Sequence, residues 1–213
     1  KKVVINDLIR GEVTVDTTDL GDFVIARSME EPVYHLAVVV DDYEMGITHV
    51  IRAEEHLSNT PRQILIQEAI GAPRPIYAHL PLVLAEDRSK LSKRKHGETV
   101  SLTYYRNKGY LPQAILNFVA LIGWNPGTDQ EVFSLDELVK SFDLSKVQKA
   151  GGIFNVQKLD WFNKKYIDAM SIEEFEKNIS QYNVPKKLLS LVKEKITKYS
   201  DIPDLLSGEL SFV

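Results

Sequence analysis

Apolar residues follow two different rhythms along this chain, and the rhythm changes near residue 100. Before that point, short runs of adjacent β-prone residues alternate with polar turns. After it, apolar residues recur at every third or fourth position, which is the spacing of one face of a helix. The pattern predicts an α/β part followed by an all-helical part.

The first hundred residues predict strands and one well-marked helix. Residues 3–30 have the alternation of short strands and turns. The run Val-Tyr-His-Leu-Ala-Val-Val-Val at 33–40 is continuously apolar, which favours a strand covered on both faces. Further strands are expected at 47–51 and at 76–84, the latter interrupted by Pro81.

The helix lies between the last two of these strands. Thr60 is expected to cap it, Pro61 suits its first turn, and Gly71 suits the position after its end. Strand, helix and strand in this order indicate a βαβ unit with parallel strands. We therefore expect half of a Rossmann-like parallel sheet, preceded by a short β-rich segment.

Start and stop signals mark the predicted helices of the second part. Pro112 opens one helix and Gly123 closes it. Two S-x-x-E capping boxes, Asn155 as a cap, and Pro185 at the start of a final helix complete the series. The two boxes are Ser134 with Glu137 and Ser171 with Glu174.

Composition excludes several classes of protein. Of 213 residues, 44% are hydrophobic and 26% charged, which is typical of a folded globular chain. No cysteine is present, so thiolate metal sites are excluded and no zinc is expected. No apolar run approaches the roughly 20 residues of a membrane helix, so no membrane partner is expected and a cytoplasmic protein fits best.

The net charge and the first residues of the chain each limit the interpretation. The net charge of −4 gives no overall basic field, so any contact with RNA must rely on local patches. The chain lacks an initiator Met and opens directly on a strand-like segment. We therefore expect a fragment or a processed chain.

A basic loop at residues 90–95, Lys-Leu-Ser-Lys-Arg-Lys, follows the last predicted strand. Ligands of α/β folds bind at the carboxyl ends of strands. Lysines at that place suit a triphosphate, since ammonium groups offset the charge that develops during phosphoryl or nucleotidyl transfer. The alternative is a solvated basic loop without a ligand.

Two further groups of polar residues are candidates for ligand binding. Arg52 follows a predicted strand and can pair with a carboxylate through two hydrogen bonds, while Glu55 can accept from a ribose or an amine. Tyr34 can reach a ligand with its hydroxyl. The alternatives are an internal Arg–Glu ion pair and a core tyrosine. For the adjacent Asp41 and Asp42, no metal site is predicted.

Several stretches of sequence occur together and in order, which is far more specific than any one of them. They are Tyr-His-Leu-Ala-Val-Val-Val-Asp-Asp at 34–42, Met-Gly-Ile-Thr-His-Val-Ile-Arg-Ala-Glu-Glu-His at 45–56, Asn-Thr-Pro-Arg-Gln at 59–63, Lys-Leu-Ser-Lys-Arg at 90–94, and Phe-Asn-Val-Gln-Lys-Leu at 154–159. This combination closely resembles glutamyl-tRNA synthetase of the bacterial type, a class I aminoacyl-tRNA synthetase. The resemblance covers essentially the whole chain and weakens after about residue 170.

The resemblance implies a division into four parts. Residues 1–33 correspond to the end of an acceptor-stem-binding insertion, and 34–84 to the second half of the Rossmann-like catalytic domain. Residues 85–169 correspond to a stem-contact domain that includes the basic loop. Residues 170–213 correspond to the start of a helical anticodon-binding domain.

The resemblance also implies an activity and its partners. A glutamate–tRNA ligase joins L-glutamate to tRNA(Glu) through a glutamyl-adenylate and consumes ATP, which is expected as its Mg²⁺ complex. The full-length enzyme is expected to be a monomer. Two positions differ from the residues that some members of the family have. Val38 stands where some members have a polar residue, and His56 stands where an aromatic ring sometimes lies near the adenine.

Ten residues receive a role by this resemblance. Tyr34, Val38 and Arg52 would bind glutamate, and Lys93 with Lys90 would stabilise the phosphates as catalytic residues. ATP would be bound by a set that includes those two lysines, namely Glu55, Val83, Lys90, Leu91, Ser92, Lys93 and Arg94.

A second ATP motif of the family, of the type His-x-Gly-His, is absent, as are an arginine and an acidic residue of the glutamate pocket. The chain alone is therefore expected to be inactive. Three alternatives remain: the sister enzyme glutaminyl-tRNA synthetase, a short paralogue that glutamylates a modified tRNA base, and a non-catalytic tRNA-binding protein. The helical pattern after residue 134 favours the glutamyl type over the first two.

Overall fold

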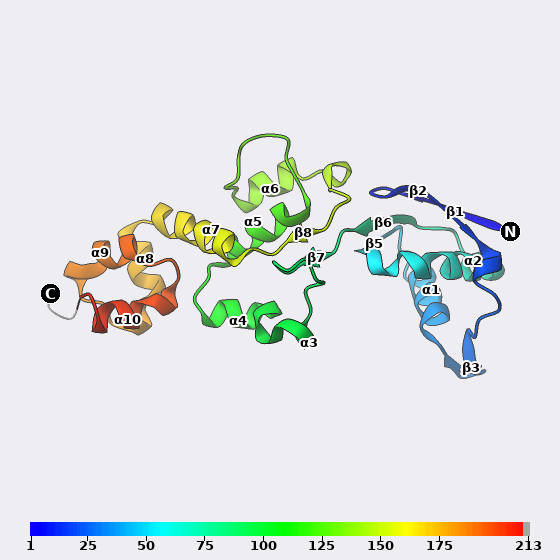
Figure 1. Ribbon diagram of the computed structural model, residues 1–213, viewed down its shortest axis with the longest axis horizontal. Coiled ribbons are helices and arrows are strands. Elements are labelled where there is room, and N and C mark those ends of the chain that lie inside the picture. Colours follow the sequence, from blue (N-terminus) through cyan, green and yellow to red (C-terminus); the bar gives the residue numbers. More distant parts are fainter. Residues whose placement is uncertain (211–213) are drawn as a thin grey trace. The chain divides into compact units, whose positions relative to one another are not determined.

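The computed structural model describes residues 1–210, which form two compact units (Figure 1). The first unit consists of Lys1–Leu82 together with Asp143–Gly151. The second consists of Val83–Phe142 and the chain from Gly152 onward. The first unit holds an α/β sheet and the second is mainly helical, which confirms the predicted fold class.

A four-stranded sheet with the order β2-β1-β6-β5 forms the first unit. Strand β1 (Lys2–Asp7) pairs antiparallel with β2 (Gly11–Asp16) and parallel with β6 (Ile76–Leu80). On its other side, β6 pairs parallel with β5 (His49–Ala53). Helix α2 (Thr60–Ile70) connects β5 to β6, so the predicted βαβ unit is confirmed.

The strand predicted at 33–40 is wrong, because the structure has helix α1 (Tyr34–Glu44) there. The helix packs on α2, buries Val39, and leaves Tyr34 and Val40 exposed. Val and Ile lower helix propensity only slightly, and a packing surface on one side outweighs that preference. The expected full burial of this run is therefore also wrong.

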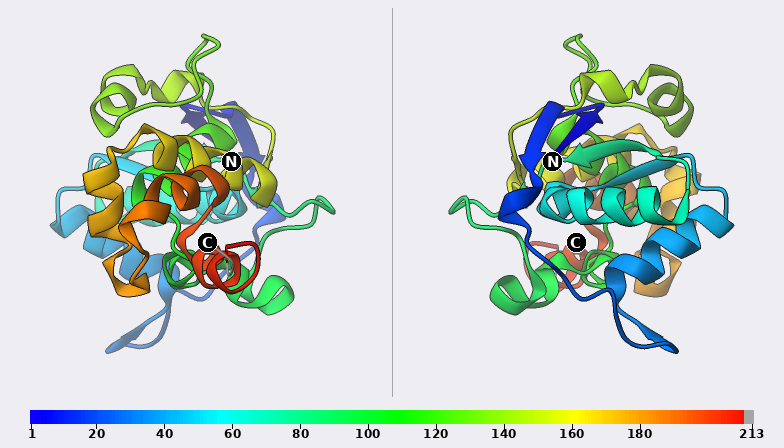
Figure 2. Two further views of the ribbon diagram at one scale, coloured as in Figure 1. Left: turned by 90° about the vertical axis from the view of Figure 1, so that its left-hand side faces the viewer. Right: turned by 90° about the vertical axis from the view of Figure 1, so that its right-hand side faces the viewer.

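Helices α1 and α2 lie on one side of the strands of the first unit (Figures 1 and 2). The core beneath them joins Val3 and Ile5 of β1 to Ile64 of α2 and Tyr77 of β6. Alternate residues of β1 are buried, as expected for a strand with one covered face. Two short strands, β3 (Ala26–Ser28) and β4 (Glu31–Pro32), form a separate pair.

The second unit begins with a short parallel pair, β7 (Val83–Leu84) and β8 (Gly152–Ile153). Its helices are α3 (Lys93–His96), α4 (Leu102–Asn107), α5 (Pro112–Gly123), α6 (Leu135–Ser141), α7 (Val156–Ala169), α8 (Ile172–Asn178), α9 (Leu189–Lys195) and α10 (Ile202–Ser207). Except for α3 and α6, these helices contribute residues to one large core that includes Phe118, Phe162 and Phe175. Among residues 1–210, no helix is long and apolar enough to cross a membrane.

Most of the predicted helix signals are confirmed. Ser134 and Glu137 form a reciprocal capping box at α6, and Asn155 caps α7. Ser171 accepts from the backbone N–H of Glu174 at α8. The helix predicted from Pro185 differs, because a 3₁₀ turn (Lys186–Leu188) precedes α9.

Candidate functional site

The ten predicted site residues fall into two groups, one in each unit. Tyr34, Val38, Arg52 and Glu55 belong to the first unit, where α1 and the end of β5 carry them. The other six, from Val83 to Arg94, belong to the second unit.

Arg52 is held from several sides at the carboxyl end of β5. Its Nη2 donates to Gln63 Oε1 at 2.7 Å and to Thr60 Oγ1 at 2.9 Å, and its Nε faces His79 Nε2 at 3.3 Å. Within residues 1–210, Nη1 has no hydrogen-bond partner on the protein. A guanidinium fixed on one side and open on the other suits a carboxylate ligand.

Two buried polar atoms near Arg52 have donor or acceptor capacity left over. Gln63 Nε2 and His35 Nδ1 find no hydrogen-bond partner among the described residues. Burial lowers the pKa of His35, and the charges of Arg62 and Arg52 lower it further. Since buried polar groups are normally paired, these atoms are consistent with a polar ligand beside Arg52.

Tyr34 and Val38 lie four residues apart on α1, which places both on one face of the helix. The Tyr34 side chain is exposed, and its ring meets His35 edge-on at 5.4 Å. Val38 is partly buried and offers only methyl groups. This face can contact the apolar part of a small ligand and supply one hydroxyl.

Glu55 lies in a 3₁₀ segment (Glu54–Asn59) directly after β5. Its carboxylate is exposed and stands 3.8 Å from His56 Nε2. The neighbouring Glu54 points back to the protein, where it pairs with Arg10 at 2.5 Å and accepts from the backbone N–H of Leu82 at 3.2 Å. Of the two glutamates, Glu54 is therefore the one that the sheet of the first unit holds through Arg10 and Leu82.

The basic loop of the second unit is a tight reversal of the chain after β7. Leu84 pairs with Lys90 in an antiparallel bridge, and the backbone N–H of Leu91 donates to Val83 O at 3.0 Å. Arg88 stands at the turn with a φ of 62°. These bonds place Lys90 and Leu91 beside β7, and Ser92, Lys93 and Arg94 follow them directly along the chain.

The cations that follow Ser92 differ in their surroundings. Lys95 is bound to Asp87 at 2.6 Å and to Ser89 Oγ at 2.7 Å. The hydrogen bond from Lys95, together with those that Ser89 donates from its hydroxyl and its backbone N–H, holds the pKa of Asp87 well below its usual range. Lys93 and Arg94 are exposed, and neither has an ion-pair partner among residues 1–210. Lys95 therefore stabilises the loop, while Lys93 and Arg94 are available to an anion.

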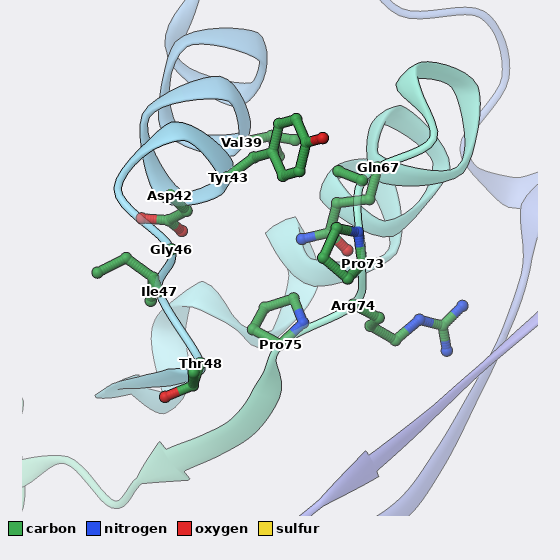
Figure 3. A pocket seen from close by; sticks show the side chains of 11 residues that line it. Val39, Asp42, Tyr43, Gly46, Ile47, Thr48, Gln67, Pro73, Arg74 and Pro75 are labelled. Atoms are coloured by element: carbon green, nitrogen blue, oxygen red, sulfur yellow. The ribbon is translucent and has the colours of Figure 1, made fainter.

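The hollow shown in Figure 3 is a different place from this candidate site. It has a volume of about 280 Å³, and none of the ten predicted residues lines it. Its walls come from the end of α1 and from the segment between α2 and β6, for example Tyr43, Pro73 and Pro75. A second hollow of about 410 Å³ lies against the basic loop and includes Leu91 in its wall.

No group of three His, Asp or Glu side chains suited to a metal ion occurs in the described part of the chain. Asp42 lies partly buried at the wall of the hollow in Figure 3, where burial raises its pKa. Asp41 and Asp42 lie near the carboxyl end of α1.

Four residues of the Arg52 environment were not predicted: Asp7, Thr60, Gln63 and His79. Thr60 was expected to cap α2, but the helix starts at Thr60 itself, and its hydroxyl bonds to Arg52. His79 is a fully buried histidine on β6. A polar residue in the middle of an apolar strand was the available signal, and it does not tell which residue the side chain meets.

Comparison with known proteins identifies the family to which this fold belongs. The sequence profile for the catalytic domain of class I tRNA synthetases (E and Q) matches residues 1–161, which include all ten predicted residues. The α/β sheet with its basic loop is thus part of a class I aminoacyl-tRNA synthetase catalytic domain. The chain belongs to the family of class I tRNA synthetases for glutamate and glutamine.

The similar curated proteins named here are glutamate–tRNA ligases. One from Desulforamulus reducens is 53% identical over 82% of this chain and 36% of its own length. Glutamate–tRNA ligase 1 of Caldanaerobacter subterraneus is 44% identical over 97% of this chain and 45% of its own length. The chain thus spans between about a third and a half of these relatives.

A solved structure shows the same fold over nearly the whole chain. The crystal structure of a glutamate tRNA ligase from Elizabethkingia meningosepticum in complex with its amino acid has a TM-score of 0.84 and 39% identity. It is matched over 98% of this chain and 46% of its own length.

Proposed function

We propose that the full-length protein containing this chain attaches L-glutamate to tRNA(Glu) in two steps that consume one ATP. The observation that carries this proposal is identity of 53 to 54% with glutamate–tRNA ligases, together with a family profile that spans every predicted site residue. A carboxylate-binding arginine and a basic loop in one catalytic domain provide the chemistry that such a reaction needs.

The first step forms a mixed anhydride. The α-carboxylate oxygen of glutamate attacks the α-phosphorus of ATP, the bond to the β-phosphate oxygen breaks, and pyrophosphate leaves. In the second step a hydroxyl of the terminal ribose of the tRNA attacks the acyl carbon, loses its proton, and AMP leaves. Negative charge builds on the phosphates in the first step, and fixed cations stabilise it.

The roles of the residues follow from their surroundings. Arg52 offers Nη1 to a glutamate carboxylate, and Tyr34 with Val38 forms the wall beside it. Lys93 and Arg94 are free to meet the phosphates, with Lys90, Leu91 and Ser92 in the same loop. Glu55 and the backbone at Val83 would contact the adenosine part.

Several finer features belong to the same proposal. ATP enters as its magnesium complex, and the full-length protein acts as a monomer in the cytoplasm. Residues 1–33 end an acceptor-stem-binding insertion, 34–84 form half of the catalytic domain, 85–169 a stem-contact domain, and 170–213 the start of an anticodon-binding domain. The helical character of the last part supports the final assignment.

The test is charging of tRNA with labelled glutamate and labelled glutamine by the full-length protein, with this chain alone as the comparison. We expect glutamate, and not glutamine, to be attached by the full-length protein. Attachment of glutamine would transfer the assignment to the sister enzyme. Salt-dependent tRNA binding by a folded protein that charges neither amino acid would show a non-catalytic RNA-binding protein instead.

A further inference from the structure

A buried chain of hydrogen bonds runs from the end of β1 to Arg52. Its first member is Asp7, whose side chain is fully buried. Oδ1 accepts from the backbone N–H groups of Ile9 at 2.9 Å and Arg10 at 2.8 Å, and Oδ2 accepts from that of His79 at 3.0 Å. Burial raises the pKa of Asp7, but these donors together with the His79 ring lower it overall. Asp7 is therefore a carboxylate that only accepts.

The second member, His79, is fixed in one tautomer by this carboxylate. Its Nδ1 lies 2.6 Å from Asp7 Oδ2, so Nδ1 carries a proton and donates it. Burial lowers the pKa of His79; Asp7 opposes this, and the charges of Arg52 and Arg10 add to it. The ring is neutral, and its Nε2 must be an acceptor.

The acceptor Nε2 faces the third member, Arg52. It lies 3.3 Å from Arg52 Nε and 3.2 Å from Thr60 Oγ1. The lone pair of one histidine nitrogen therefore orients the guanidinium edge that lies next to the protein. The charged groups around His79 are Asp7 on β1, Arg10 in the turn after it and Arg52 on β5; α2 contributes the neutral Thr60, and the Tyr77 ring on β6 stacks at 6.1 Å.

We propose that Asp7 and His79 are positioning residues for Arg52: the Asp7 carboxylate fixes the His79 tautomer, and His79 Nε2 holds Arg52 so that its Nη1 faces the substrate carboxylate. The inference rests on the proposed role of Arg52 in binding glutamate. Neither residue touches the substrate. Their effect is on the affinity for glutamate and not on that for ATP, because Arg52 is the proposed substrate-binding residue that His79 contacts, and its proposed ligand is glutamate.

The decisive variant is Asp7→Asn in the full-length protein. An amide has the size of the carboxylate, but its NH₂ group donates where the oxygen accepted. The ring must then accept at Nδ1 and carry its proton on Nε2, which points an N–H at Arg52. We expect the KM for glutamate to rise about 10- to 100-fold, the range for losing one hydrogen bond to a charged group, while the KM for ATP changes less than about twofold.

Tyr77→Phe is the matched control. It removes a buried hydroxyl that is hydrogen bonded to Gln67, two residues from His79 on the same strand, and keeps the ring that stacks on His79. We expect it to lower stability and to leave the KM for glutamate unchanged. If Asp7→Asn, like the control, lowers the stability but leaves the KM for glutamate unchanged, the role of Asp7 is only structural and the proposal is overturned.

A second measurement needs no variant. The ¹⁵N shifts of the His79 ring in the unmodified protein distinguish the two tautomers, and a proton on Nε2 would contradict the proposal even if Asp7→Asn does not fold. The outcomes also separate this inference from the proposed function. A full-length protein that charges no glutamate refutes the function, whereas normal charging with an unaffected Asp7→Asn variant refutes only the positioning role.

Discussion

Lys93 and Lys95 are two residues apart in the basic loop, yet their surroundings give them different roles. The Lys95 ammonium is bound to Asp87 and Ser89, while Lys93 is exposed without an ion-pair partner among the described residues. Sequence alone does not distinguish them, since both are lysines in one run of cations. The difference arises from the turn at Asp87–Arg88, which brings an acid to one lysine only.

This difference predicts the effect of Lys93→Ala in the full-length protein. We expect glutamyl-adenylate formation to fall by about 10²- to 10³-fold, because one stabiliser of the phosphate charge is lost, while the unfolding temperature stays the same. The measurement is the rate of adenylate formation with ATP and glutamate.

Lys140→Ala on α6 is the matched control, since Lys140 is an exposed lysine in the same unit without a predicted role. It is expected to leave the rate unchanged. Unchanged turnover in Lys93→Ala would remove Lys93 from the site.

Tyr34 and Val38 share a face whether the chain forms a strand or a helix there. Residues four apart share a face in a strand, where the period is two, and in a helix, where it is 3.6. The shared face of this pair therefore does not depend on the type of element. Leu36 does depend on it: a strand places it beside Tyr34, but the helix turns it away.

At the scale of elements, periodicity and end signals predict helices better than burial predicts strands. Helix α5 begins at Pro112, and helices α6 and α7 are capped at their N-termini by Ser134 and Asn155. These start signals are local in the sequence. The run at 33–40 carries no such signal, and its β-branched residues favour a strand. The packing surface that α2 offers decides that this run forms a helix, and the sequence of the run does not show that surface.

Gly152 on β8 gives a prediction at this scale. A Cβ atom there would overlap the backbone carbonyl oxygen and the side chain of Ile122 at the end of α5. Backbone cannot give way as a flexible side chain can. We expect Gly152→Ala to lower the free energy of unfolding by about 3 kcal/mol or more, measured by urea unfolding.

Gly46→Ala serves as the comparison for this change. No atom lies within 4 Å of the added Cβ, so only the φ of 66° is unfavourable, and the loss should be about 1 kcal/mol. Equal losses at both positions would argue against a close contact at Gly152.

For the whole molecule, the buried pair Asp7 and His79 determines whether the stability of the fold rises or falls with pH. Folding lowers the pKa of His79 from its ordinary 6.5, so below that value the unfolded chain binds more protons than the folded one. Stability is then present above pH 6.5 and is lost as pH falls toward the folded pKa. His35 acts in the same direction, and Asp7 extends the loss below its ordinary 3.8.

We therefore expect the free energy of unfolding to decrease between about pH 7 and about pH 5, by up to about 1.4 kcal/mol per pH unit for each such histidine. Urea unfolding at several pH values measures the slope. His79→Phe should reduce it, while replacement of the exposed His49 by Ala should not. A stability that rises on acidification would contradict a neutral His79.

The short segment Asp143–Gly151 affects how the chain can fold while it is being synthesised. This segment belongs to the first unit, although the chain on both sides of it belongs to the second. Arg10 donates to Lys149 O at 2.7 Å. This hydrogen bond of the first unit cannot form until Lys149 has been synthesised. A ribosome adds about 5–20 residues per second, so the first unit stays incomplete for several seconds after Leu82 has been made. During that time the four-stranded sheet, whose strands all lie within residues 2–80, is present on the nascent chain without the segment that Arg10 contacts, and a chaperone would be most useful to this protein in that period.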